Sequence, residues 1–150
     1  MDIYNYPKKD HQTIADLFEQ ILSTKSTNKR KSLFEEVAKE LLLHADAENA
    51  TFYKALRNHT ETSEMIQHAE KEHKEVKDYI AKLNCLSIES EKWVEQFGEF
   101  KHSVTHHVKE EEKDIFEEAK KVLSKEAAKQ LAVDMETIKQ GKTCSLNRLN

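Results

Sequence analysis

Two stretches of the chain each pair a histidine with a glutamate four residues later. The first pair is His44 with Glu48 and the second is His107 with Glu111, and an aromatic residue follows each histidine nine residues further on. Residues four apart lie on one face of an α-helix, one turn from each other. Each pair can therefore direct an imidazole and a carboxylate at the same metal ion.

A further histidine precedes each pair, so that the order His, then His-x3-Glu, occurs twice. The repeat gives six candidate metal ligands: His11, His44, Glu48, His73, His107 and Glu111. Mixed imidazole and carboxylate ligands suit iron, manganese or zinc. Six ligands are more than one tetrahedral zinc ion needs. The set therefore predicts two metal ions, with Glu48 and Glu111 as carboxylate bridges between them.

The elements that must position these residues are long amphipathic helices. The chain has only two Gly and one Pro, so little in it interrupts helices. Apolar residues recur in steps of three and four over about residues 7–24, 29–57, 61–83 and 91–123, which predicts four helices with one apolar stripe each. Short polar connections favour an all-α, antiparallel up-down-up-down four-helix bundle.

A fifth, shorter helix is predicted over about residues 125–139, with Gly141 as its cap. The polar tail, residues 142–150, is expected to be loose. At 150 residues, the chain is expected to form a single domain whose core spans about residues 8–123.

All six candidate ligands fall on the apolar stripes. A single histidine there is most often a hydrogen-bonded core residue, but a buried carboxylate without a partner is costly. No comparable excess of Lys or Arg lies on the stripes to pair with Glu48 and Glu111, so the set favours a metal centre. The height of the ligands along the bundle agrees less well for one pair of helices. If the third and fourth helices are antiparallel, His73 and His107 differ in height by roughly six residues, or about 9 Å.

Other histidines and glutamates allow alternatives. His68, His102 and His106 lie off the stripes and are expected at the surface or in contact with a ligand. Glu72 and Glu110 adjoin ligands and could accept hydrogen bonds from them or replace one.

A ferritin-like site would instead use Glu-x-x-His on two helices. Glu70 to His73 and Glu99 to His102 have that spacing. However, Glu99 and His102 lie off the stripe and the site would leave His44 unused, so this arrangement is less well supported.

Composition argues against nucleic-acid and membrane partners and favours a reducing compartment. The net charge is −4 and no face is clearly basic, so no nucleic-acid partner is expected. No apolar run approaches the roughly 20 residues of a membrane span, and residues 1–7 lack the apolar core of a signal peptide. Cys85 and Cys144 fit no zinc spacing. A cytoplasmic location is the simplest expectation.

At these residues the sequence resembles the hemerythrin family, and within it the HHE cation-binding domains, over about residues 8–123. The resemblance implies a four-helix bundle that holds an oxo- or hydroxo-bridged di-iron centre. It further implies that the four histidines of the repeat are terminal ligands and that the two glutamates are bridges.

Two departures distinguish the chain from the oxygen-carrying hemerythrins. Those proteins have a further histidine four residues after the third-helix ligand, where this chain has Lys77. They also have His-x4-Asp on the fourth helix, where this chain has His107-x3-Glu111. Both departures point to the HHE subgroup and away from reversible oxygen carriage. Water, Glu72 or Glu110 could fill the position of the missing nitrogen ligand.

Three functions are consistent with this pattern. The first is a non-haem di-iron protein that binds or senses O2, NO, peroxide or iron, with azide as a further small ligand. The second is an enzyme that decomposes peroxide, as catalases do, or reduces NO. The third is a protein-interaction bundle in which the metal is only structural.

Overall fold

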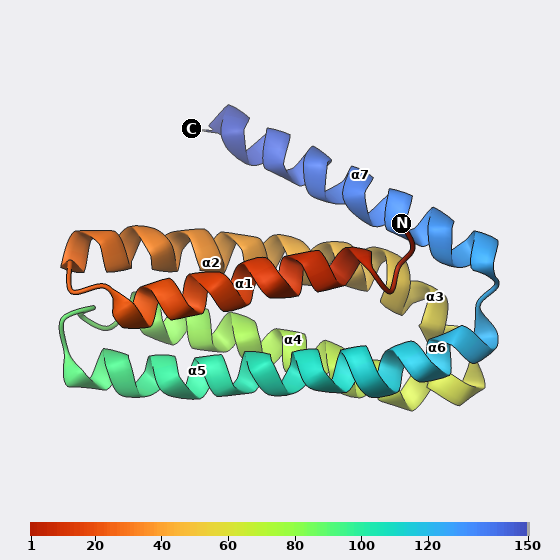
Figure 1. The fold of residues 1–150 in the computed structure, drawn as a ribbon, viewed down its shortest axis with the longest axis horizontal. Helices are drawn as coiled ribbons and strands as arrows, with labels where there is room; N and C mark the ends of the chain where they lie inside the picture. The colour runs from red at the N-terminus through yellow and green to blue at the C-terminus, as the bar shows by residue number, and fades with distance from the viewer. Residues whose placement is uncertain (150) are drawn as a thin grey trace.

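The fold is a four-helix bundle crossed by a fifth helix (Figure 1). The computed structural model describes the backbone of residues 1–149 and the side chains up to residue 143. Within that range the chain is almost entirely helical and has no β-strand. These features confirm the predicted all-α, up-down-up-down class.

The bundle has four helical arms, each of which runs along its length, and two of the arms contain a π-helical segment. The elements in order are α1 (Tyr6–Ser23); α2 (Thr27–Glu48), η1 (Asn49–Tyr53) and α3 (Lys54–Arg57); α4 (Thr60–Asn84); and α5 (Glu91–Glu110), η2 (Glu111–Ile115) and α6 (Phe116–Val122). The ends of all four arms lie within two residues of the predicted boundaries. The two π-helical segments, η1 and η2, were not predicted.

Local signals account for where the helices begin. Pro7 lies in the first turn of α1, where its missing N–H is no loss. The Ser26 hydroxyl accepts a hydrogen bond from the Lys29 N–H at 3.2 Å, and the Ser90 hydroxyl accepts one from the Trp93 N–H at 3.1 Å. Such serine caps stabilise helices α2 and α5 at their N-termini.

The core consists of two apolar clusters with a polar layer between them. One cluster lies toward the α1–α2 connection and contains Phe18, Phe97 and Phe100, whereas the other, at the opposite end, contains Phe52 and Phe116. Along each arm, the predicted ligands fall between residues of the first cluster and residues of the second. The buried polar residues are therefore enclosed by apolar packing at both ends.

The connection between α4 and α5 removes the mismatch in height between His73 and His107. Helix α5 begins beyond the end of α4, and residues 85–90 extend along the bundle to reach it (Figure 1). Leu86 and Ile88 of this connection pack against the first cluster. The Nε2 atoms of His73 and His107 consequently lie 3.0 Å apart.

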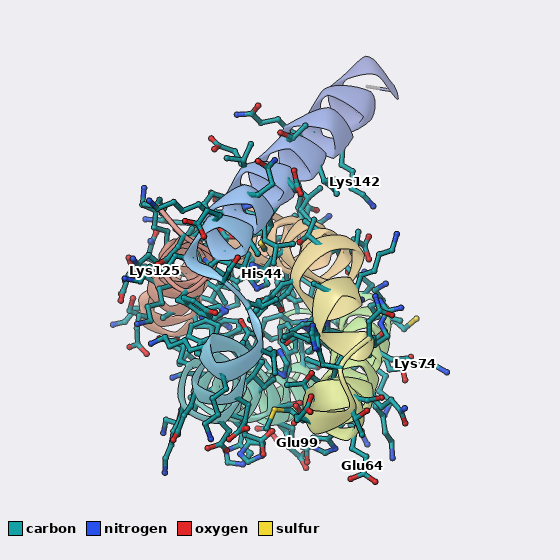
Figure 2. The ribbon with its side chains drawn as sticks, turned by 90° about the vertical axis from the view of Figure 1, so that its right-hand side faces the viewer. His44, Glu64, Lys74, Glu99, Lys125 and Lys142 are labelled. Atoms are coloured by element: carbon teal, nitrogen blue, oxygen red, sulfur yellow. The ribbon has the colours of Figure 1, made fainter. Side chains whose placement is uncertain are left out.

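Helix α7 (Lys125–Leu149) leaves α6 and crosses the bundle at an angle (Figures 1 and 2). The Ile3 N–H donates to the Ala128 carbonyl at 3.0 Å, and Met135 is fully buried. The helix continues through Gly141, so the predicted end at residue 139 and the predicted loose tail are wrong up to Leu149; Asn150 lies outside the described residues. A single glycine in a helix costs only about 1 kcal/mol, and no proline follows it.

Figure 2 shows His44 inside the bundle beneath α7, whereas the labelled lysines and glutamates lie at the rim. None of the described helices combines the length and the apolar character needed to cross a membrane.

Gly98 offers a test of the helical fold. It lies within α5, and a Cβ added there would meet no atom within 4 Å. Gly98→Ala should therefore raise the free energy of unfolding by about 0.5–1 kcal/mol, measured by urea denaturation. Gly141→Ala, at the other uncrowded helical glycine, is the matched comparison. Destabilisation by Gly98→Ala would contradict the open surroundings described for this position.

Candidate metal centre

The π-helical segments begin within one residue of the same place in the repeat. Segment η1 starts directly after Glu48, and η2 starts at Glu111. In a regular α-helix, a residue nine positions after a histidine lies about 180° around the helix from it. The π-helical turns change this phase, so that Tyr53 and Phe116 are both buried. Short π segments of this kind are frequent at functional sites.

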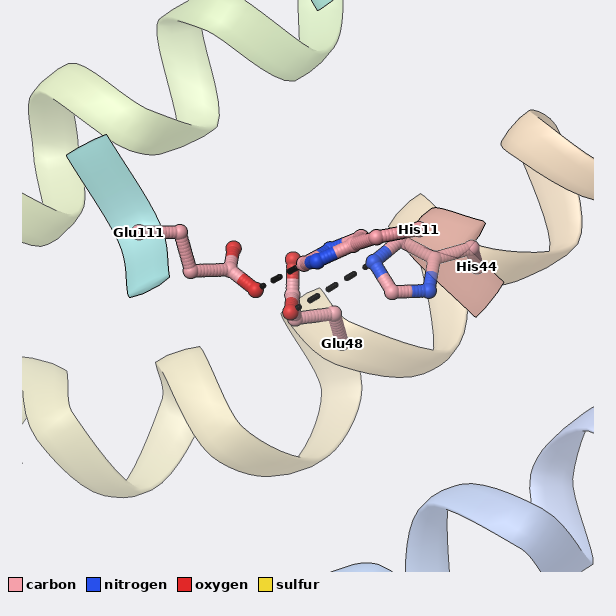
Figure 3. A group of neighbouring side chains, drawn as sticks. All are labelled: His11, His44, Glu48 and Glu111. Atoms are coloured by element: carbon pink, nitrogen blue, oxygen red, sulfur yellow. Dashed lines mark ion pairs between the residues drawn. The ribbon is translucent and has the colours of Figure 1, made fainter. Parts of the chain in front are cut away.

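All six residues predicted as ligands meet at the centre of the bundle. Their potential ligand atoms form two groups, one with His11 and His44 and the other with His73 and His107. Glu48 and Glu111 belong to both groups, and the atoms within each group lie within 4.8 Å of one another. Figure 3 shows the first group. None of the six residues is more than 7% exposed.

Each of the four imidazoles is held at its Nδ1 atom by an oxygen from a neighbouring arm. The contacts are Glu112 to His11 at 3.0 Å, Asp10 to His44 at 2.8 Å, Asn49 to His73 at 2.8 Å, and Glu72 to His107 at 2.9 Å. An acceptor at Nδ1 fixes the proton there and leaves the Nε2 lone pair free to bind a metal. The site thus presents four Nε2 atoms to its interior.

Several inward-facing atoms have no hydrogen-bond partner among the described residues. They are the Nε2 atoms of His11 and His44, both carboxylate oxygens of Glu48, and Oε1 of Glu111. Buried polar atoms in proteins are nearly always paired. In the other group, the Nε2 atoms of His73 and His107 face each other at 3.0 Å. Metal ions would satisfy all of these atoms, so the donor set fits a metal centre.

The imidazoles and carboxylates of the site stabilise each other's charged forms. Burial by itself would lower the pKa of His44 and His107, but the surrounding carboxylates outweigh burial and raise both pKa values to about 10. Burial would raise the pKa of Glu48, but the imidazoles of His44 and His73 hold it well below its usual value. In the absence of metal, protons on the imidazoles therefore balance the carboxylates.

Tyr53 is a residue of the centre that the sequence analysis missed. Its hydroxyl donates a hydrogen bond to Oε2 of Glu111 and lies 3.4 Å from Nε2 of His107. Its ring stacks on His73, with ring centroids 5.1 Å apart. Burial, together with the charges of Glu111 and Glu48, raises the pKa of Tyr53 well above 10. The available signal was its position nine residues after His44, matching that of Phe116 after His107.

Lys77 does not reach the centre. Its ammonium group pairs with Asp46 at 3.0 Å, and 45% of its side chain is exposed. Of the two carboxylates considered as substitutes for the missing nitrogen ligand, Glu72 accepts a hydrogen bond from His107, whereas Glu110 pairs with the exposed His106 at 3.0 Å. In the structure, both contacts turn these carboxylates to other partners.

Helix α7 is linked to the centre indirectly, through Asp10. The Lys139 ammonium lies 2.6 and 2.7 Å from the two carboxylate oxygens of Asp10. Asp10 in turn holds Nδ1 of His44. The position of α7 is therefore linked to the orientation of one imidazole of the site.

The pKa shifts predict how the stability of the metal-free protein depends on pH. Because the folded pKa of His44 and His107 is raised from 6.5 to about 10, their contribution is fully present below pH 6.5 and is lost as the pH rises to about 10. Glu48, with a lowered pKa, contributes above pH 4.5. Chemical denaturation of metal-free protein should therefore give the greatest stability between about pH 4.5 and 6.5.

Metal-bound protein should not lose this stability above pH 6.5. Metal ligands must lose their protons, so the stabilisation that added metal provides should increase with pH. A metal-free protein with equal stability at pH 6 and pH 9 would contradict the protonated state of these imidazoles.

Comparison with known proteins supports the same site. The family model of the hemerythrin HHE cation binding domain matches residues 2–119. A solved hemerythrin HHE cation binding domain-containing protein from Mycobacterium kansasii is 25% identical, with a TM-score of 0.86, and the match covers 99% of this chain and 92% of that one.

A curated protein of Nostoc sp. (strain PCC 7120 / SAG 25.82 / UTEX 2576), named DNA nickase, is 24% identical over 142 residues. That match covers 93% of this chain but 39% of the relative, so the chain spans about two fifths of the relative's length. The family model covers most of the chain, and the buried His and Glu groups lie within the matched region. The chain belongs to the hemerythrin HHE cation-binding domain family.

Proposed function

We propose that the protein holds two iron ions at the centre of the bundle and uses them to bind or sense O2, NO or peroxide. The observation that carries this proposal is the sharing of Glu48 and Glu111 by both groups of ligand atoms. Two carboxylates common to two groups can bridge a pair of metal ions. His11 and His44 would complete one ion's protein ligands, and His73 and His107 those of the other.

The donor set fits iron better than calcium or a single zinc ion. Calcium takes oxygen ligands, whereas four of the six inward-facing residues are histidines. A single zinc ion is satisfied by four ligands. Carboxylate-bridged metal pairs held between the helices of a bundle are a recurrent arrangement for iron and manganese. When bound, an iron pair would supply redox chemistry and an exchangeable position for O2, NO, peroxide or azide.

The protein's own contribution is orientation and exclusion of water. The four contacts at Nδ1 fix the direction of each imidazole before any metal binds. The two apolar clusters enclose the polar layer from both ends of the bundle. Such preorganised ligands and a dry cavity set the affinity of a metal site and the reactivity of its open position.

Tyr53 favours a second candidate function, the decomposition of peroxide. Decomposing two peroxide molecules to two water molecules and one O2 requires protons to move between oxygen atoms. The Tyr53 hydroxyl holds a proton next to Glu111, and its raised pKa keeps that proton in place in the metal-free protein. It lies against His73 and His107, and His73 is the ligand whose helix carries Lys77 four residues later, where a further imidazole is absent.

We also propose that the protein is located in the cytoplasm and that its partners are small molecules. The name of the Nostoc relative describes a protein of which this chain matches 39%. With a net charge of −4, this chain is expected to act on small ligands and not on nucleic acid.

The first test of the proposal is metal content. Protein reconstituted with Fe²⁺ without oxygen should hold two iron ions per chain, one for each group of ligand atoms. After exposure to air it should show the near-ultraviolet charge-transfer bands of a bridged ferric pair. His107→Ala should lower the iron content to one ion or less, since it removes an inward-facing nitrogen.

His106→Ala is the matched control, because His106 adjoins His107 but is exposed and pairs with Glu110. This variant should keep the iron content of the wild type. Elemental analysis that finds one tightly bound zinc ion, or no iron after reconstitution, would reject the proposal. Iron loss in His106→Ala but not in His107→Ala would reject the assignment of ligands.

Tyr53→Phe separates catalysis from binding. If the hydroxyl supplies a proton to the reaction, iron-loaded Tyr53→Phe should retain its metal but decompose peroxide roughly 10²-fold more slowly. Tyr4→Phe is the control, because the Tyr4 hydroxyl is buried, has no hydrogen-bond partner among the described residues and lies in the second apolar cluster. Oxygen evolution per bound iron is the measurement. Wild-type turnover no faster than that of free iron would eliminate the enzymatic alternative.

A further inference from the structure

The outer face between α4 and the α5–η2 arm is strongly acidic. Two neighbouring cavities lie on this face, of about 420 and 590 Å³, and Glu72 lines both. The first cavity is lined by five acidic residues and the second by four, counting Glu72 in each, and no described Lys or Arg lines either one. The chain as a whole has 24 basic and 28 acidic residues, so the absence of basic residues here is a local feature.

Three potential ligand atoms converge in the first cavity. They are Nε2 of His68, Oε2 of Glu72 and Oε2 of Glu110, and all lie within 4.8 Å of one another. His68 and Glu72 are one turn apart on α4, whereas Glu110 is the last residue of α5 before the π-helical segment η2. A mixed set of one imidazole and two carboxylates is a donor set for a divalent transition metal.

Both carboxylates are already held in place by their other oxygen. Oε1 of Glu72 accepts from Nδ1 of His107 at 2.9 Å, and Oε1 of Glu110 lies 3.0 Å from Nε2 of His106. Each contact leaves Oε2 directed at the cavity. Glu72 is also nine-tenths buried, at 8% exposure, so its direction is set by the packing of the bundle.

The distances suit a metal ion better than a direct hydrogen bond. Nε2 of His68 lies 3.6 Å from Oε2 of Glu72 and 3.7 Å from Oε2 of Glu110, which is beyond the usual range of an N–H···O bond. Ligands at about 2.1 Å from a tetrahedral ion are about 3.4 Å from each other. Nε2 of His68 is thus spaced from both carboxylates much as the ligands of one ion are spaced from each other.

We propose that His68, Glu72 and Glu110 form an external site for a divalent transition-metal ion, separate from the buried centre, and that this site is the position from which the centre is loaded. Glu72 provides the link, because its two oxygens face the external cavity and His107 respectively. The acidic face concentrates cations around the site. The binding of metal at this site is independent of the proposed function, whereas its role in loading rests on that function.

The test uses Co²⁺ added to metal-free protein, because Co²⁺ absorbs visible light and stays divalent. Wild-type protein should bind three ions, two that resist brief treatment with EDTA and one that exchanges at once. His68→Ala and Glu110→Gln should weaken the exchangeable ion at least about tenfold and keep the two resistant ions. Both variants should also fill the resistant positions several-fold more slowly in stopped-flow absorbance.

Two variants with matched chemical changes serve as controls. His59→Ala removes a histidine outside both cavities, and Glu35→Gln removes an exposed carboxylate on α2. Both should bind and load as the wild type does. Loss of the exchangeable ion in these controls as well would mean that overall charge, and not the external site, holds it, and would overturn the proposal.

The outcomes separate the external site from the buried centre. Equal Co²⁺ content and equal loading rates in wild type, His68→Ala and Glu110→Gln would overturn the external site. Loss of the exchangeable ion with unchanged loading would overturn the loading role. Absence of resistant ions in the wild type would overturn the proposed function, while the exchangeable ion and its loss in His68→Ala would still support the external site.

Discussion

The burial of two carboxylates in the middle of a helical bundle is the constraint on which the rest of this structure depends. Glu48 and Glu111 are fully buried, and an uncompensated buried charge costs several kcal/mol. The bundle cannot avoid this cost by rotation, since the same two arms carry the apolar residues of both clusters. Compensation must come from cations at the same level, which are protons on the imidazoles or metal ions between them.

The contacts that orient the imidazoles form a closed circuit around the bundle. Asp10 of α1 holds His44 of α2, and Asn49, which follows α2, holds His73 of α4. Glu72 of α4 then holds His107 of α5, and Glu112 of η2 returns to His11 of α1. Each orienting residue is the sequence neighbour of a predicted ligand but acts on the next arm. A shift of any one arm would therefore disturb two neighbouring positions in the site, which favours a single register for all four helices.

Periodicity along single helices was sufficient to predict the six inward-facing residues, because the apolar stripe of each arm passes through them. It could not predict Tyr53, since a regular 3.6-residue repeat directs a residue nine positions after His44 away from the core. The π-helical turn that reverses this direction depends on backbone hydrogen bonds between residues five apart, and residue propensities hardly distinguish it from an α-helical turn. The passage of α7 through Gly141 was missed for a related reason, because a glycine permits a helix end but does not require one.

The repeat that organises the sequence is not symmetric in its chemistry. Both π-helical segments turn an aromatic residue inward, but Tyr53 brings a hydroxyl to Glu111, whereas Phe116 packs its ring against Tyr4 and Phe52. The group with His73 and His107 therefore has a proton donor beside it, and the group with His11 and His44 has none from this pair of residues. Two metal ions bound between the same two carboxylates would experience different surroundings. The difference between the two positions would come from Tyr53 and not from Glu48 and Glu111, which both groups share.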